Sequence, residues 1–329
     1  MKTVILFDPS IGSQNVGDSI ISESIRKIAY ANFQNYLICV LPTQMPVSSK
    51  IAKRYQDADI KLVMGSNLLQ SHMIFSFGRR GLYTHAIRQW DTSVLSKRIV
   101  SRSILWGCGW QNYDERIDRL TEKYWHSILD DQYIHSVRDD FTLRMLNKIG
   151  IYNVVNTGCP TTWGLSPEHC ALIPSQKADK VITTITDYRP DKQRDTLLLK
   201  ALLDNYDKVY LWLQGQGDEL YFNSFNDEIK ENITLIQPNL VAYSNMLDSG
   251  SIDYVGTRLH GGIFAMQHKV RSIIIGIDNR ALEMKNTGLC VLPAIEMEDL
   301  NNLLQSKIYY NISLPDENIQ RFITQFFEE

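Results

Sequence analysis

An arginine and a histidine stand two residues apart where a strand-like run passes into an apolar helical stretch. The run 251–255 ends at Gly256, and Thr257 is a favoured N-cap for the helix that follows. This places Arg258 and His260 in the first helical turn. Unpaired backbone N–H groups and the positive end of the helix dipole favour a phosphate or carboxylate there, and a guanidinium adds bidentate donors. The junction therefore predicts an anion-binding site.

Two glycines follow the histidine. Gly261 and Gly262 leave room for a ligand to approach the backbone. The structural alternative is that the arginine and histidine pair with a neighbouring carboxylate. Because the positive end of a helix disfavours cations, we favour the functional interpretation.

The composition bounds the classes of protein. A chain of 329 residues with 44% hydrophobic and 22% charged residues is typical of a soluble globular protein of two domains. A formal net charge of -3 provides no broad basic field, which argues against nucleic acid as a partner. The apolar residues 4–7 are too few for a signal peptide or a membrane span, so we expect a cytoplasmic protein. The five cysteines lack the spacing of a zinc site or a disulfide framework and are interpreted as reduced thiols.

Short β-branched runs alternate with amphipathic segments along the whole chain, a pattern typical of parallel sheets covered by helices. The first block has expected strands at 3–7, 36–41, 60–64, 103–106, 133–137 and 153–156, and the second has them at 180–185, 208–213, 233–236, 252–255 and 271–275. The turn-rich stretch 157–176 separates the blocks. We predict an α/β fold of two Rossmann-like domains facing a cleft, over residues 1–165 and 177–329, with the last helix (315–327) a candidate to cross back onto the first domain.

Polar loops that follow the predicted strands are the next candidates, because open α/β sheets bind ligands beyond the carboxyl ends of their strands. Asn15, Gly17 and Asp18 lie in the first such loop. Asp18 either caps a helix that begins at Ser19 or acts in the site. Asn67 follows the third strand, as part of another polar turn.

Further strand ends carry an arginine and aromatic residues. Arg138 stands at a second strand-to-helix junction, where it either contacts a ligand or pairs with a neighbouring aspartate. Gly109 suits a close approach, Trp110 is a candidate contact for a sugar, and Cys108 shows no feature of a nucleophile. The stretch 77–83 mixes basic and aromatic residues, which is compatible with contact to a membrane surface or with a solvated loop.

Taken in order, these landmarks resemble the polysaccharide pyruvyl transferase family. The residues that carry the resemblance are Asn15-Val16-Gly17-Asp18, Gly107-Cys108-Gly109, Ser136-Val137-Arg138-Asp139, Thr157-Gly158-Cys159-Pro160, Arg258-Leu259-His260 and Asp278-Asn279-Arg280. Gly65-Ser66-Asn67 and Cys159 depart from the family pattern, in which a glycine-rich turn and an acidic residue are frequent.

The resemblance implies two Rossmann-like domains similar to the GT-B glycosyltransferase architecture. It implies transfer of a pyruvyl group from phosphoenolpyruvate, as a co-substrate, onto a sugar as a ketal in exopolysaccharide or capsule synthesis, without a metal or other cofactor. The acceptor would be an oligosaccharide or a lipid-linked sugar. Carried over by position, Arg138, Arg258, His260 and Arg280 would be the donor-site residues. The second domain would hold the donor and the first the acceptor.

Two roles for the histidine stay open. His260 would be the general acid, because neighbouring ligand anions favour its protonated form; alternatively it only binds phosphate and Asp18 moves the protons. Two other functions compete with pyruvyl transfer: a nucleotide-sugar-dependent glycosyltransferase of GT-B type, and a non-catalytic relative that binds sugar or phosphate.

Overall fold

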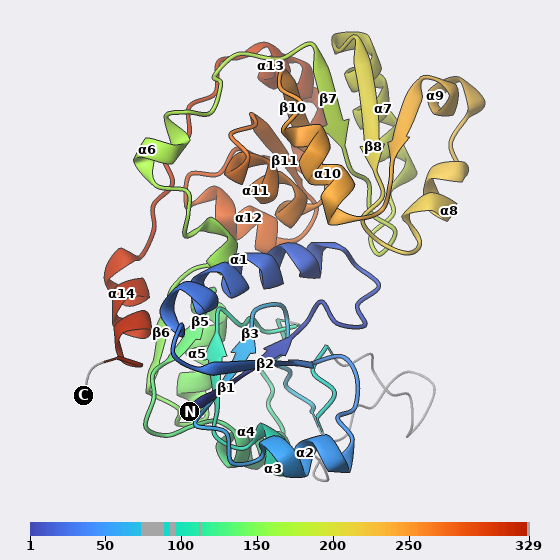
Figure 1. Ribbon diagram of the computed structural model, residues 1–329. Coiled ribbons are helices and arrows are strands. Elements are labelled where there is room, and N and C mark those ends of the chain that lie inside the picture. The colour runs from blue at the N-terminus through green and yellow to red at the C-terminus, as the bar shows by residue number, and fades with distance from the viewer. Residues whose placement is uncertain (74–88, 93–96, 112, 328–329) are drawn as a thin grey trace. The chain divides into compact units, whose positions relative to one another are not determined.

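The computed structural model describes residues 1–73, 89–92, 97–111 and 113–327, and within them the chain forms two compact units. Unit 1 comprises Met1–Ser13, Ile21–Pro160 and Pro315–Glu329, and unit 2 comprises Gln14–Ile20 and Thr161–Leu314. By these bounds, residues 14–20 lie in unit 2 with residues 161–165, and the last segment, Pro315–Glu329, lies in unit 1, the crossing considered above for the last helix. Each unit has a parallel sheet accompanied by helices, which confirms the predicted α/β class (Figure 1).

Unit 1 is built on a four-stranded parallel sheet of order β2-β1-β3-β4. A parallel pair, β5 and β6, continues beside it, because Cys108 beyond the end of β4 bridges to Val137 in β5. The strands are β1 (Thr3–Asp8), β2 (Leu37–Pro42), β3 (Ile60–Met64), β4 (Ser103–Trp106), β5 (His135–Val137) and β6 (Val154–Asn156). The helices are α1 (Gly17–Asn32), whose residues before Ile21 belong to unit 2, α2 (Ser49–Tyr55), α3 (Lys97–Val100), α4 (Arg119–Ile128), α5 (Asp140–Lys148) and α14 (Asp316–Thr324).

Unit 2 is built on a six-stranded parallel sheet of order β12-β11-β10-β7-β8-β9. Its strands are β7 (Lys180–Thr183), β8 (Lys208–Trp212), β9 (Ile233–Ile236), β10 (Ile252–Gly256), β11 (Ser272–Gly276) and β12 (Val291–Pro293). Its helices are α6 (Pro167–Cys170), α7 (Lys192–Asn205), α8 (Asp218–Asn223), α9 (Asp227–Glu231), α10 (Leu240–Leu247), α11 (Leu259–Gln267), α12 (Asn279–Lys285) and α13 (Leu300–Gln305), with 3-10 turns at Pro160–Thr162 and Ala294–Asp299. β12 was not among the predicted strands.

The sequence explains these elements locally. The central strands are mostly apolar because both faces of a parallel sheet are covered, and every residue of β3, β10 and β11 is buried, including Lys61 and Asp253. Helices begin at polar caps: Asp139, Asp191 and Asp278 each accept a hydrogen bond from a backbone N–H in the first turn of α5, α7 and α12. The apolar runs and the caps together set the strand-to-helix junctions that carry the site.

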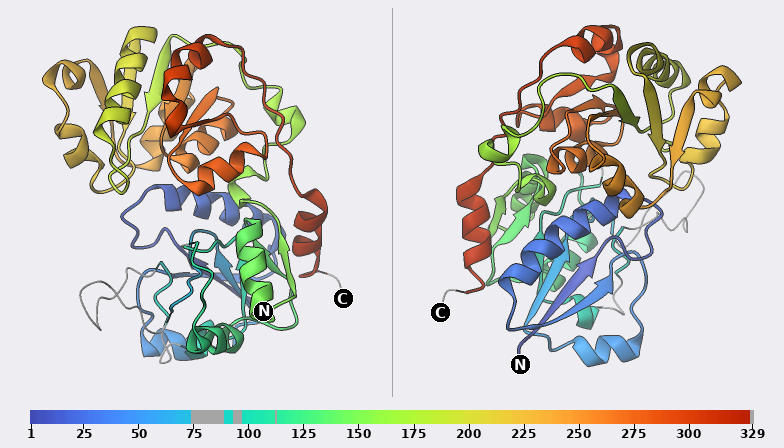
Figure 2. Two further views of the ribbon diagram at one scale, coloured as in Figure 1. Left: turned by 180° about the vertical axis from the view of Figure 1, so that it is seen from behind. Right: turned by 45° about the horizontal axis from the view of Figure 1, so that its top comes forward.

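The last helix returns to unit 1, as the two views in Figure 2 show for the red segment beside β6. The Asn318 side chain donates a hydrogen bond to the carbonyl of Asn156 over 2.9 Å. Phe322 is fully buried and its ring packs edge-on to Trp106 at 5.5 Å between centroids. The Gln325 side chain at the end of the helix also pairs with the backbone N–H and carbonyl of Ile134, so apolar burial and these backbone contacts hold α14 on this unit.

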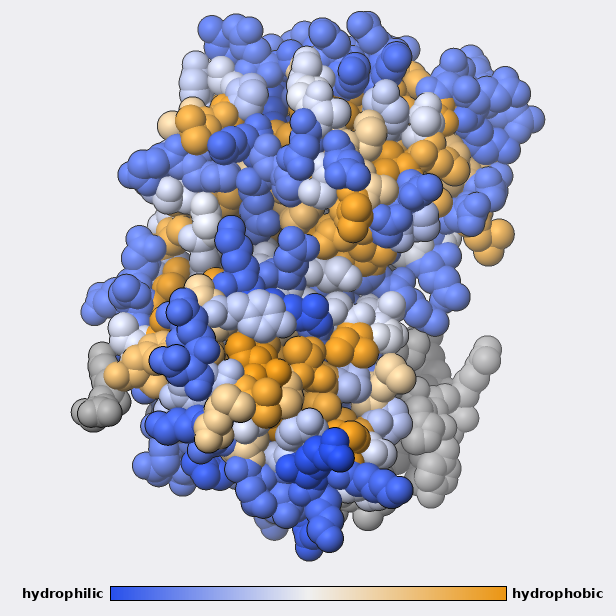
Figure 3. Space-filling view, in the orientation of Figure 1, coloured by the Kyte–Doolittle hydropathy of each residue, from blue (hydrophilic) through white to orange (hydrophobic). Residues whose placement is uncertain are grey.

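The edge strand of unit 1 leaves apolar surface uncovered. Figure 3 shows hydrophobic side chains gathered in the region of β2, where Leu37 is 45% exposed. Residues 38–40 of this strand are only half-buried. Among the helices of the described residues, none has both the length and the hydropathy to cross a bilayer.

Candidate active site

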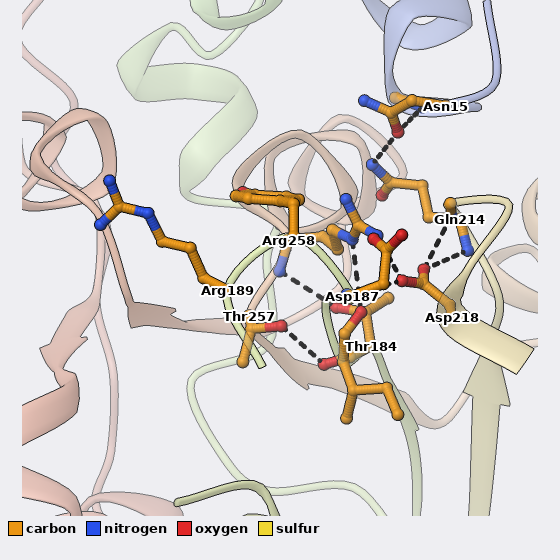
Figure 4. Close-up of polar contacts among 12 residues, drawn as sticks. Asn15, Thr184, Asp187, Arg189, Gln214, Asp218, Thr257 and Arg258 are labelled. Atoms are coloured by element: carbon orange, nitrogen blue, oxygen red, sulfur yellow. Dashed lines mark hydrogen bonds and ion pairs between the residues drawn. The ribbon is translucent and has the colours of Figure 1, made fainter. Parts of the chain in front are cut away.

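The strand order of unit 2 defines where a ligand is expected within that unit. Numbered from β7, the order is 6-5-4-1-2-3, the doubly wound order in which the chain leaves neighbouring strands β7 and β10 in opposite directions. Sheets of this kind bind ligands at that switch point, beyond the carboxyl ends of the two strands. The loops that follow β7, β8 and β10 meet at this edge (Figure 4). The loop after β11 joins them, because Arg189 Nη1 donates to the carbonyl of Ile277 over 3.1 Å.

Arg258 is the residue at which α11 begins. Its φ of -95° and ψ of 106° make it the N-cap, and no side chain caps this helix. Thr257 is not the cap, contrary to the prediction, because its hydroxyl donates to the carbonyl of Thr184 over 3.2 Å. The backbone of Arg258 is held on both sides: its N–H donates to Thr184 Oγ1 (3.2 Å) and its carbonyl accepts from Tyr254 Oη (2.7 Å). These bonds fix the start of α11 on β7 and β10.

The Arg258 guanidinium is buried among carboxylates. The side chain is 4% exposed, and its Nη2 donates to Asp218 and, over 3.1 Å, to Asp187. Its Nε donates to the carbonyl of Ile185 (3.3 Å). Burial raises the pKa of the Asp218 carboxyl, although the Arg258 guanidinium opposes the rise. Pairing with carboxylates, the structural alternative considered from sequence, is thus present in the structure.

Two glycines make this packing possible. A Cβ added to Gly215 would stand 2.5 Å from Arg258 Nη2, and one added to Gly217 would stand 2.4 Å from Asp187 Oδ2. A side chain at either position would force the Arg258 guanidinium or the Asp187 carboxylate to move from its present place. The glycine spacing after β8 therefore serves the arginine and its two carboxylates.

Arg280 lies in the same cluster through Tyr188. The Tyr188 ring faces the Arg258 guanidinium at 5.0 Å, and Arg280 Nη2 donates to its hydroxyl over 3.2 Å. Arg280 Nε also donates to Asp278 over 3.0 Å. Burial opposes ionisation of Asp278, but the Arg280 guanidinium, the Ala281 N–H and the Arg189 charge together outweigh it and hold the pKa of this carboxyl below its usual value. The structure thus brings the predicted Arg258 and Arg280 together.

His260 and Gly261 occupy the first turn of α11, as predicted. The His260 side chain is half-buried. The Gly261 carbonyl accepts a hydrogen bond from Tyr243 Oη (2.8 Å). Gly262 serves packing rather than ligand approach, because a Cβ there would stand 2.6 Å from a carbon of Ile274 in β11.

The segment that carries Asn15 and Gly17 is part of unit 2. Asn15 Oδ1 accepts hydrogen bonds from the Gly17 N–H (3.0 Å) and from Gln214 Nε2 (2.9 Å), as Figure 4 shows for Asn15 and Gln214. The Val16 N–H donates to the Gln214 carbonyl (2.9 Å). Asp18 is 5% exposed and lies inside the first turn of α1, one residue after its start, so it does not cap a helix beginning at Ser19.

The remaining predicted residues lie in unit 1, where three of them meet. Arg138 Nε donates to Asp139 over 3.3 Å, and its Nη2 donates to the side-chain oxygen of Asn67. Gly109 lies against the same side chain, since a Cβ there would stand 2.3 Å from Arg138 Nε. The glycine was predicted for a close approach, and the group that approaches is this guanidinium.

The side chains of Trp110 and Cys108, near this point, are buried in the core of unit 1. Trp110 is 3% exposed and its indole N–H donates to Ser71 Oγ over 3.0 Å, so burial leaves it no face for a sugar. Burial raises the pKa of the Cys108 thiol to about 12, which disfavours the nucleophilic thiolate at neutral pH. The stretch 77–83 lies outside the described residues.

Sequence reasoning missed four residues of the unit 2 cluster: Asp187, Tyr188, Gln214 and Asp218. All of them follow β7 or β8. The signal that could have found them is the polar, glycine-spaced run 214–218 directly after an apolar strand.

Comparison with solved structures shows the fold. The chain is similar to the UDP-GlcNAc 2-epimerase of Methanocaldococcus jannaschii, with a TM-score of 0.54 and 14% identity over 99% of each chain. It is also similar to a putative UDP-N-acetylglucosamine 2-epimerase of Listeria monocytogenes, with a TM-score of 0.52 and 10% identity over 98% of this chain and 90% of that one. This likeness confirms the predicted GT-B-like fold.

Comparison of sequences shows the family. No curated protein matches the chain. The family model described as polysaccharide pyruvyl transferase matches residues 15–279, a span that begins at Asn15 and includes Arg138 and Arg258. The match covers most of the 329 residues. The chain therefore belongs to the polysaccharide pyruvyl transferase family.

Proposed function

We propose that the protein transfers the pyruvyl group of phosphoenolpyruvate to two hydroxyls of a sugar, forming a ketal and releasing phosphate. The acceptor is a sugar of a cell-surface polysaccharide or of its lipid-linked precursor. The observation that carries the proposal is the start of α11: His260 and Gly261 follow Arg258 at the switch point of the unit 2 sheet, with Arg280 in the same cluster. Membership of the family gives this site its reaction class.

The chemistry of the donor suits this site. Phosphoenolpyruvate carries a carboxylate and a phosphate, and the first turn of α11 offers N–H groups and the positive end of the helix dipole to one of them. Arg258 and Arg280 supply guanidinium groups on the same edge. Arg138, in unit 1, keeps the donor-binding role that the family resemblance assigns to it.

The reaction proceeds by protonation of the donor, addition of one sugar hydroxyl, and substitution of phosphate by the second hydroxyl. A proton added to the methylene carbon converts it to a methyl group and leaves a cationic carbon, which the first sugar hydroxyl attacks. The second hydroxyl then forms the other C–O bond as the C–O bond to phosphate breaks. The two protons lost by the sugar hydroxyls equal the proton added to the methylene carbon and the proton taken up by the released phosphate.

His260 is the proposed acid for the first step, because an imidazolium beside the donor anions is stabilised by them. Asp18 is the alternative group for moving protons. Replacement of His260 by Gln separates the roles: retained donor binding with abolished turnover indicates acid catalysis, and lost donor binding indicates that the histidine binds phosphate.

Thermal-shift and calorimetric titrations test the donor without an acceptor, since a ligand that binds only the folded state raises its stability. Wild type should be stabilised by phosphoenolpyruvate and not by UDP-GlcNAc. Arg280→Ala should weaken the effect, whereas Arg116→Ala, which removes an equal charge from a 95% exposed side chain in unit 1, should not. Arg258→Lys is preferable to Arg258→Ala, because alanine would leave a buried Asp218 without its counter-ion. Stabilisation by UDP-GlcNAc alone would replace this proposal with a nucleotide-sugar-dependent function.

A further inference from the structure

The two carboxylates that hold Arg258 differ in how firmly they are fixed. The Asp218 side chain is 1% exposed and accepts backbone N–H bonds from Gln214 (3.1 Å), Gly215 (2.7 Å) and Asp187 (3.1 Å). With three amide donors and the guanidinium, this carboxylate is locked in place.

Asp187 is held more loosely. Its side chain is 35% exposed, and its Oδ1 accepts from Arg258 Nη2 over 3.1 Å. No second donor to this carboxylate is found in the part of the chain that the structure describes. Asp187 can therefore turn into solvent at the loss of one charge-assisted hydrogen bond, which water replaces in part.

The charges of the cluster make such a movement necessary for binding of an anion. Arg258 with Asp187 and Asp218 sums to +1 - 2 = -1 when all are ionised, and the Arg280–Asp278 pair adds +1 - 1 = 0. A donor anion beside this cluster would meet net repulsion. If Asp187 leaves, the cluster becomes neutral and one N–H of Arg258 becomes available to the ligand.

We infer that Asp187 is a displaceable counter-ion of Arg258, which the carboxylate of the donor replaces, whereas Asp218 is the permanent partner that positions the arginine. The inference rests on the proposed function. A carboxylate is the group expected to take this place, because it presents the same planar pair of oxygens to the guanidinium as the aspartate it replaces. The gap at Gly217, where the Asp187 carboxylate now lies, shows that the backbone admits a carboxylate at this point.

Opposite effects of two matched substitutions test the inference. Asp187→Asn removes the competing charge and should tighten phosphoenolpyruvate binding about fivefold, the factor that corresponds to ~1 kcal/mol. Asp218→Asn loosens Arg258 and should weaken binding by at least a similar factor. Asp227→Asn, at an 83% exposed side chain of α9 in the same unit, makes the same charge change and should leave the dissociation constant unaltered.

The measurement is a calorimetric dissociation constant for phosphoenolpyruvate at fixed ionic strength, with phosphoglycolate and glycerol 3-phosphate as analogues with and without a carboxylate. The gain in Asp187→Asn should be larger for phosphoenolpyruvate and phosphoglycolate than for glycerol 3-phosphate. An equal gain for all three overturns the assignment of the carboxylate. Weaker binding in Asp187→Asn overturns the displacement itself, and because this side chain is partly exposed, the result stands even where Asp218→Asn does not fold.

Failure of the proposed function has a different signature. If wild type and Asp187→Asn both fail to bind phosphoenolpyruvate, the donor assignment falls and the inference falls with it. If wild type binds and the Asp187 variant does not bind more tightly, the donor assignment stands and the displaceable counter-ion alone is refuted.

Discussion

A buried histidine in β5, the strand that leads to Arg138, should make unit 1 sensitive to mild acid. His135 is fully buried at the start of β5, three residues before the arginine. Its Nδ1 accepts the Leu105 N–H (3.2 Å), which leaves Nε2 protonated to donate to the Asp130 carbonyl (2.9 Å). Burial lowers the pKa of His135 from 6.5 to about 4. The neutral ring is thus the form that fits the fold.

The magnitude follows from linkage. Because the folded pKa lies below the unfolded one, the stability that the neutral ring supports is fully present above pH 6.5 and is lost as the pH falls toward 4. At a pH of about 4.5 the unfolded chain binds a proton at this site and the folded chain mostly does not. The two pKa values then correspond to a loss of about 2.5 kcal/mol in the free energy of unfolding.

Urea unfolding of wild type and His135→Asn at about pH 7.5, 6 and 4.5 measures this loss. Asparagine offers an acceptor near the position of Nδ1 but does not titrate, so the difference between the two proteins isolates the histidine. At neutral pH the variant should be less stable by about 1 kcal/mol, for the lost hydrogen bond. This deficit should vanish or reverse at the lowest pH. A deficit of the same size at all three pH values would refute the reasoning.

Three further perturbations probe the contacts of the site. Gly109→Ala places a methyl group against Arg138 and should lower turnover about 100-fold while the free energy of unfolding changes less, as steady-state kinetics and urea titration would show. Tyr254→Phe removes the hydroxyl that supports the Arg258 carbonyl and should cost about 1–3 kcal/mol of stability, and a smaller loss in urea would argue against a tight network. The pKa of Asp278 is lowered in the folded protein, so the stability that its carboxylate contributes is present above pH 3.8 and is lost as the pH falls below it. Asp278→Asn should remove this contribution. Its melting temperature should therefore decline less between pH 5 and pH 3 than that of wild type, by on the order of a few degrees.

Much of the fold could be predicted because it depends on local patterns. The predicted strands 60–64, 103–106 and 233–236 agree with the structure at both ends. These runs are mostly apolar and are bounded by polar or glycine residues, so the hydrophobic pattern and the residues that break it mark the same ends. β12 was missed because Val291–Pro293 is only three residues long and contains a proline at the sheet edge.

The site could be predicted only in part, for a physical reason. Arg258 and His260 were found because both lie at one strand-to-helix junction, which can be recognised from neighbouring residues in the sequence. Asp187 and Asp218 come from two other loops, and their meeting at the arginine depends on the strand order β10-β7-β8. Tertiary pairing of this kind leaves no spacing signal in the sequence, so a carboxylate partner for Arg258 could be considered but Asp187 and Asp218 could not be identified.

The passage of residues 14–20 into unit 2 bears on how the protein can be cut into parts. The chain crosses between the units at four places, after residues 13, 20, 160 and 314. A fragment limited to 161–314 would lack Ile20 from its hydrophobic core and the segment that bridges to Gly215 through Asn15. Recombinant expression of this unit should therefore need residues 14–20 supplied by fusion or in trans. In a chimera of two relatives joined once in the linker, residues 14–20 would come from one parent and the Asp218 loop that they contact from the other.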